Sequence, residues 1–253
     1  GGGGGRGRPP GGRRARPPPA PPHPTIPLAA GVGALATITL SLVASRYVLE
    51  WLAGFGWPIA VYVAIAGLLG YGPVMLFCWW ASHRWGRRSL RADSGLYARW
   101  SDPGWGPVAW LGVLTAPITL GTIILVTGIP FSSNTEDIDT VGGTRGYVLT
   151  TLVLAVVAAP VVEEIVFRGF VLRSFLGRMP WVVAVLVQGL LFGAAHFDPV
   201  RGAGNIGLVV VLSGAGIVLG GAAYLFRRIT PTIIAHAIIN ALAMTIALTG
   251  WGQ

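Results

Sequence analysis

The uncharged run Gly146-Tyr-Val-Leu-Thr-Thr-Leu-Val-Leu-Ala-Val-Val-Ala-Ala-Pro-Val-Val162 ends directly at two adjacent carboxylates, Glu163 and Glu164. With a helical continuation to about residue 176, this segment exceeds the roughly 20 residues that cross a bilayer. A charged side chain at the bilayer centre costs roughly 2.5–3.5 kcal/mol on insertion scales, and ionisable residues there are functional by default. The run therefore predicts a membrane-spanning helix that carries a functional site.

The composition of the whole chain is that of a membrane protein. Of its 253 residues, 53% are hydrophobic and 11% are charged, whereas a soluble domain has about 25% charged residues. We therefore predict an all-α fold, a polytopic transmembrane helix bundle over residues 28–250 with about seven spans. The expected spans lie at about 28–49, 57–81, 105–128, 146–162 with its continuation to 176, 180–197, 206–226 and 231–250.

Residues 1–27 differ from the rest of the chain, because they are rich in Gly, Pro and Arg. Such a segment buries too little apolar surface to offset its chain entropy, so we expect a disordered tail. Its arginines suit anionic headgroups, and membrane lipids are the first expected partner. The sequence leaves the oligomeric state open.

Arginines concentrate in the tail and in three connections between spans, at 82–104, 173–178 and 227–228. The alternate connections are acidic or poor in charge, and their acids are Glu136, Asp137, Asp139 and Asp198. The positive-inside rule then predicts a multi-pass protein of the cell membrane with a cytoplasmic amino terminus and an extracytoplasmic carboxyl terminus. Because the arginines flank apolar spans, the net charge of +9 does not indicate nucleic-acid binding.

The first group of residues that could carry out chemistry is Glu163-Glu164-Ile-Val-Phe-Arg168. Residues four apart share a face of a helix, whereas neighbours point about 100° apart. Glu164 is therefore expected to pair with Arg168, and Glu163 is left without a local partner and available as a base. The alternative is that both glutamates belong only to a buried ion-pair network.

Two histidines supply the second and third groups, Phe192-Gly-Ala-Ala-His196 and His236-Ala-Ile-Ile-Asn240. His236 and Asn240 share a helical face, and two converging donors can stabilise an oxyanion. A single histidine of this kind is more often a core residue, but both occur together with the glutamate pair.

Straight spans leave one difficulty in bringing these groups together. Glu163 and His196 are equally far from a turn near Met179 and Pro180, which favours equal heights on antiparallel helices. His236, however, lies near the start of the last span, on the other side of the membrane from His196. At least one segment must tilt, kink or lie in the interface, and prolines can cause this.

The three motifs in this order resemble the CPBP family, which comprises the type II CAAX prenyl endopeptidases and the Abi-type, lysostaphin-resistance-protein-like proteases. The family pattern is EExxxR, FxxxH, then HxxxN or HxxxD on separate membrane helices, and every position is filled here over about residues 145–245. The resemblance implies an intramembrane endopeptidase that acts on a membrane-associated peptide or protein.

The same resemblance implies roles for the motif residues. Glu163 with His196 would activate the attacking water, and His236 with Asn240 would hold the oxyanion. Glu164, Arg168 and Phe192 would support the site. No cofactor is firmly expected; if zinc is bound, its ligands would be Glu163, His196 and His236, because two histidines and a carboxylate can leave one coordination position open.

Two other classes of function remain compatible with intramembrane Glu and His. A proton-coupled transporter uses such residues as a relay, although the chain shows no internal repeat with paired broken helices. A non-catalytic immunity or scaffold protein would bind a partner within the bilayer. Peptidase activity that is lost on changing Glu163 would distinguish the endopeptidase from the transporter and from the non-catalytic protein.

Overall fold

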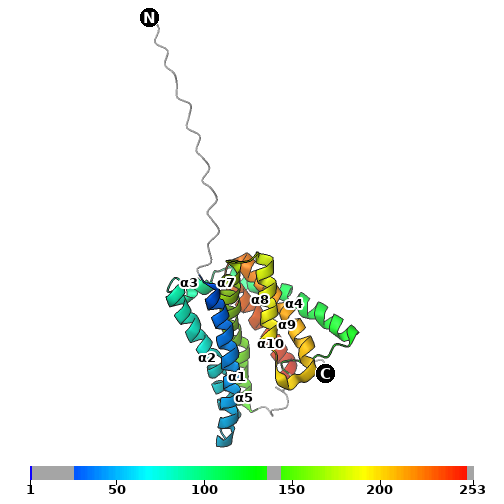
Figure 1. Ribbon diagram of the computed structural model, residues 1–253. Helices are drawn as coiled ribbons and strands as arrows, with labels where there is room; N and C mark the ends of the chain where they lie inside the picture. Colours follow the sequence, from blue (N-terminus) through cyan, green and yellow to red (C-terminus); the bar gives the residue numbers. More distant parts are fainter. Residues whose placement is uncertain (2–25, 136–143, 250–253) are drawn as a thin grey trace.

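The computed structural model describes residue 1 and residues 26–135 and 144–249. The expected disordered tail at 1–27 and the acids Glu136, Asp137 and Asp139 therefore fall almost wholly outside the described residues. Within the described part of the chain every regular element is a helix, which confirms the all-α fold (Figure 1).

Among the residues that the structure describes, six helical segments are long and apolar enough to cross a membrane: Leu28–Phe55, Ile59–Trp85, Asp102–Thr127, Arg145–Leu176, Pro199–Phe226 and Thr230–Thr249. They contain α1 (Leu28–Leu52), α2 (Ile59–Trp85), α4 (Asp102–Thr127), α9 (Asn205–Phe226) and α10 (Thr230–Thr249). Their outer faces expose large apolar side chains such as Leu68, Leu76 and Leu125. A surface of this kind is suited to lipid, and the polytopic bundle is confirmed.

The expected span at 180–197 is shorter than the others. Helix α8 covers only Trp181–Ala194, which is 14 residues. At about 1.5 Å per residue it is roughly 21 Å long, less than the roughly 30 Å of a hydrocarbon core. The seven expected spans therefore become six long helices and one short one.

The fourth span, Arg145–Leu176, is a succession of α- and π-helical turns. It contains α5 (Arg145–Leu152), η3 (Val153–Ala158), α6 (Ala159–Glu163), η4 (Glu164–Val171) and α7 (Leu172–Leu176), where η3 and η4 are π-helical. Pro160 is the second residue of α6, just after η3, and has no N–H to donate to the preceding turn, which favours local departure from the α-helix. Wide turns of this type often occur at functional sites.

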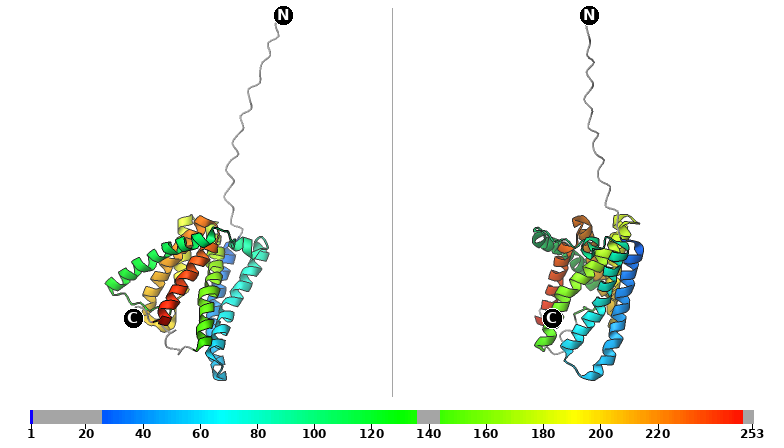
Figure 2. Two further views of the ribbon diagram at one scale, coloured as in Figure 1. Left: turned by 180° about the vertical axis from the view of Figure 1, so that it is seen from behind. Right: turned by 90° about the vertical axis from the view of Figure 1, so that its left-hand side faces the viewer.

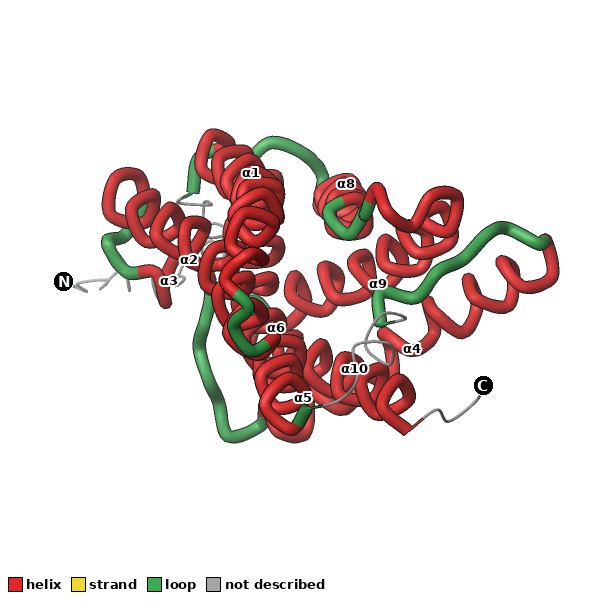
Figure 3. Tube along the Cα trace, turned by 90° about the horizontal axis from the view of Figure 1, so that it is seen from below, coloured by secondary structure: helices red, strands yellow, loops and turns green. Residues whose placement is uncertain are grey.

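This irregular span lies in the middle of the bundle. Seen from below, α5 and α6 lie between α2 on one side and α9 and α10 on the other (Figure 3). All eight residues of η4 are buried, including Glu164 and Arg168. The charged side chains of this segment therefore face protein rather than lipid.

The arginine-bearing connections meet at one end of the bundle, as the two views of Figure 2 allow the reader to follow. Helix α3 (Leu90–Ser94) precedes Gly95, whose carbonyl accepts a hydrogen bond from Ile229 N. Arg228 forms a buried ion pair with Asp102 at 2.5 Å. These contacts join the connection before α4 to the one between α9 and α10.

Candidate active site

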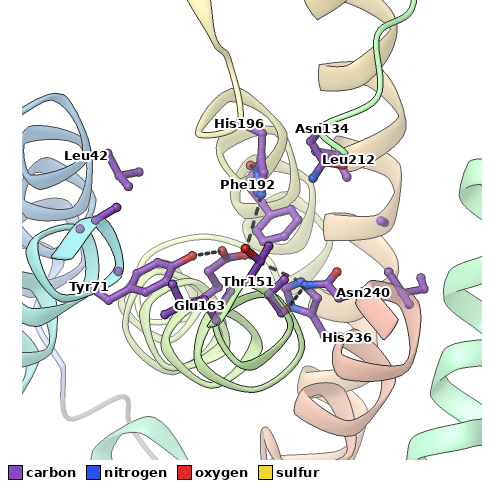
Figure 4. Close-up of a pocket in the computed structure, with 18 of the residues that line it drawn as sticks. Leu42, Tyr71, Asn134, Thr151, Glu163, Phe192, His196, Leu212, His236 and Asn240 are labelled. Carbon is purple, nitrogen blue, oxygen red and sulfur yellow. Dashed lines mark hydrogen bonds and ion pairs between the residues drawn. The ribbon is translucent and has the colours of Figure 1, made fainter. Parts of the chain in front are cut away.

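Glu163 is the point at which the three motifs meet (Figure 4). It is the last residue of α6 and is 8% exposed. Its Oε2 lies 3.9 Å from His196 Nε2 and 3.8 Å from His236 Nε2. Its Oε1 accepts a hydrogen bond of 3.1 Å from the hydroxyl of Tyr71 on α2. Groups from three motifs and one residue outside them therefore surround a single carboxylate.

The neighbouring carboxylate has different partners. Arg168 Nη1 donates to Glu164 Oε1 at 2.8 Å, with both side chains fully buried. Arg168 Nη2 donates to Gly216 O at 3.2 Å, which ties η4 to α9. The same Glu164 oxygen receives a 3.0 Å contact from His236 Nδ1. The expected pair with Arg168 is present, and the contact with His236 was not anticipated.

Both histidines are oriented through Nδ1. His196 Nδ1 lies 2.8 Å from the carbonyl oxygen of Phe192, and His236 Nδ1 lies 3.0 Å from Glu164 Oε1. A carbonyl and a carboxylate oxygen can only accept, so each Nδ1 is the donor. Each Nε2 is thereby directed at Glu163, as an acceptor in a neutral ring or a donor in a charged one.

The ring of Phe192 packs against Arg168 and against both histidines. The guanidinium carbon of Arg168 lies 4.4 Å from the centroid of this ring. The same centroid lies 4.8 Å from the ring centroid of His196 and 5.7 Å from that of His236. A cation over an aromatic face is stabilised by the ring quadrupole, most strongly when both are desolvated. The supporting position expected for Phe192 agrees with these contacts.

Asn240 lines the same cavity from α10, four residues after His236. Its Nδ2 donates to the carbonyl oxygen of Ala155, in the π-helical segment η3, at 2.7 Å. An amide nitrogen carries two N–H groups, so one remains for another acceptor. Asn240 therefore combines a fixed orientation with a spare donor.

The structure brings together the motifs that straight spans would separate. The turn between α7 and α8 lies at 177–180, midway between Glu163 and His196. Helix α8 ends at Ala194, and His196 lies just beyond its end. The second motif therefore meets the first and third within the bundle.

A cavity of about 440 Å³ opens onto Glu163. Most of its wall is apolar and comes from α1, α2, α4, α9 and α10, with polar groups of Tyr71, Thr151, His196 and Asn240 in its lining. Thr151 Oγ1 is buried and has no hydrogen-bond partner among the described residues. An apolar cavity with a few convergent polar groups is typical of a ligand site.

Three polar residues of this cavity, Tyr71, Asn134 and Thr151, are missing from the sequence interpretation. Asn134 lies in the connection after α4. Tyr71 is a lone polar side chain in an apolar run far along the chain from the motifs, and Thr151 follows Thr150 in another apolar run. For Tyr71 and Thr151 the only available signal was a hydroxyl in a membrane span. That signal is weak, because such hydroxyls commonly bond their own helix, as Thr150 does with Gly146 O.

A metal does not fit the residues as they are arranged. In residues 26–135 and 144–249, no group of three or more His, Cys, Asp or Glu side chains is placed to hold a metal ion. Zinc ligands lie about 2.0–2.2 Å from the metal, and drawing Glu163, His196 and His236 to such positions requires movement. The donor types alone would suit zinc.

Comparison with known proteins identifies the part of the chain that carries the site. Residues 145–242 match the family model described as Type II CAAX prenyl endopeptidase Rce1-like. No curated protein and no solved structure matches the chain. The matched segment runs from α5 into α10 and contains all three motifs, while α1, α2 and α4 lie before it. The chain therefore carries, at residues 145–242, an Rce1-like domain of the type II CAAX prenyl endopeptidase family.

Proposed function

We propose that this protein is an intramembrane endopeptidase that hydrolyses a peptide bond of a membrane-associated peptide or protein. The observation that carries the proposal is the position of Glu163 Oε2, which faces two imidazole Nε2 atoms and has no hydrogen-bond partner. The separations of 3.9 and 3.8 Å are too long for direct hydrogen bonds. A water about 2.8 Å from both an oxygen and a nitrogen spans such a separation.

In this reaction Glu163 takes a proton from the water with the assistance of His196, and the water oxygen bonds to the peptide carbonyl carbon. The carbonyl oxygen becomes an oxyanion. The proton on Glu163 passes to the leaving nitrogen as the C–N bond breaks, which yields a carboxylic acid and an amine. General acid–base catalysis of this kind contributes about 10²–10⁴-fold.

The oxyanion is stabilised by the spare N–H of Asn240 and by Nε2–H of a protonated His236. Glu164 lies against Nδ1 of His236 at 3.0 Å, which fixes the ring with Nε2 toward Glu163. Arg168 pairs with the same oxygen of Glu164. These groups form a chain from the oxyanion into the packed interior.

The apolar wall of the cavity suits a substrate with a hydrophobic portion, and the name of the matched family points to a prenylated peptide. The first probes are a farnesylated CAAX peptide and the same peptide without the farnesyl group, each incubated with reconstituted protein and examined by mass spectrometry. Wild-type protein is expected to cleave at least one probe at a single bond, and Glu163→Gln none. Equal cleavage by Glu163→Gln would refute the mechanism.

No step of this mechanism requires a metal, so activity is expected to survive exhaustive chelation. A loss that added zinc restores would assign Glu163, His196 and His236 as ligands instead. The chain is a multi-pass membrane protein, and the one-sided arginine connections support a cytoplasmic amino terminus. A reporter fused after Gln253 should then be extracytoplasmic.

A further inference from the structure

We propose that Tyr71 is a positioning residue of the catalytic carboxylate, which makes α2 part of the active site. This inference rests on the proposed function. Tyr71 lies well before residues 145–242, and none of the three motifs includes it. Yet its hydroxyl donates to Glu163 Oε1 at 3.1 Å and its side chain lines the cavity (Figure 4).

A glycine of α2 lies against the side chain of Leu154 in the fourth span. A Cβ added at Gly67 would lie 2.5 Å from Leu154 Cδ2 of η3, a contact that real side chains essentially never make. Gly67 therefore lets α2 lie close against the span that carries Glu163. Tyr71 is four residues after Gly67 and so shares its face of the helix. Tyr71 therefore lies on the face of α2 that packs against the fourth span, within reach of the carboxylate.

The hydrogen bond from Tyr71 determines how the carboxylate of Glu163 faces the site. It is the one hydrogen bond that this carboxylate makes within the described residues, because Oε2 has no partner. The last torsion of a glutamate is broad and roughly two-fold, so an unheld carboxylate samples many orientations. With Oε1 held by the phenol, Oε2 is the oxygen presented to His196 and His236.

The hydrogen bonds of Glu164 come from other parts of the chain. Its Oε1 is held by Arg168 and His236, both within the matched segment. The part of the region before residue 145 that the structure describes therefore supplies a hydrogen bond to the base, Glu163, and none to the ion pair of Glu164 with Arg168. This assigns α2 a function beyond covering the core.

The decisive variant is Tyr71→Phe, which keeps the ring and removes the donor. Hydrogen bonds to charged groups contribute about 1.5–3 kcal/mol, which corresponds to about 10- to 100-fold. We expect kcat to fall by about that factor, with KM nearly unchanged. The matched control is Tyr62→Phe, on the same helix, whose hydroxyl bonds Leu52 O and Trp57 N far from Glu163. The control should retain wild-type kcat.

A second readout does not depend on a substrate. Infrared difference spectra of wild type against Glu163→Gln isolate the carboxylate bands of Glu163. In the Tyr71→Phe background these bands should shift, and in the Tyr62→Phe background they should not. Unshifted bands, or an unchanged kcat in an active Tyr71→Phe enzyme, would overturn the role of Tyr71 alone. A folded wild type that cleaves no probe would instead overturn the proposed function, and this inference with it.

Discussion

Glu163 and Glu164 are neighbours in the chain but lie in two contrasting regions of the molecule. Each has one carboxylate oxygen without a hydrogen-bond partner among the described residues. Glu164 is 0% exposed and its Oε1 is bound by Arg168 and His236, whereas Glu163 lines a cavity and its Oε2 faces the Nε2 atoms of two histidines. The roughly 100° between successive helical residues is sufficient to divide them. One carboxylate belongs to the packed interior and the other to the chemistry, and each prediction below tests that division.

The largest effect is expected for His196→Ala on the cavity side. It removes the partner of the water-activating carboxylate, so kcat should fall by about 10²–10⁴-fold without loss of stability. The control is His83→Ala, because His83 makes the same Nδ1 contact to a carbonyl four residues earlier, Trp79 O at 2.8 Å. Peptide-cleavage kinetics with thermal melts should separate the two; a similar defect in both would contradict the role of His196.

Arg168→Ala tests the packed side. It leaves Glu164 as an uncompensated buried charge, and breaking such a pair typically costs about 3–5 kcal/mol. We expect a lower unfolding free energy together with reduced activity. The exposed pair Arg46–Glu50 has the same spacing at 3.1 Å, and Arg46→Ala should cost less than about 1 kcal/mol. Equal destabilisation in detergent unfolding measurements would show that Arg168 has no special structural role.

A smaller effect is expected for Asn240→Ala. Losing one oxyanion donor costs about 10²–10³-fold in kcat, and binding of substrate changes little because the charge exists only during reaction. Thr245→Ala on the same helix removes only a bond to Ala241 O and should leave kcat intact. A defect of Asn240→Ala confined to KM would remove it from the oxyanion site.

Much of the fold and part of the site were predictable from local rules. Apolar length identified the long spans, and the four-residue spacing of Glu164 and Arg168 predicted their ion pair. The equal arms about Met179 predicted that His196 would approach Glu163. Each of these inferences depends on helix geometry within one or two elements, which sequence spacing reports directly.

The rest depends on how helices approach one another. The π-helical turns lie on either side of α6, and α2 contacts the fourth span at Gly67 and Tyr71. Tyr71 and Glu163 are far apart in the chain, so no spacing rule relates them. The contact between His236 and Glu164 likewise arises only when α10 packs against the fourth span.

The central claim is tested most directly by comparing Glu163→Gln with Glu164→Gln, each measured by cleavage kinetics and by thermal unfolding in the same detergent. We predict that Glu163→Gln keeps the wild-type melting temperature and loses activity, while Glu164→Gln loses both stability and activity. Equal destabilisation by the two substitutions, or an active Glu163→Gln, would contradict the division between the two carboxylates.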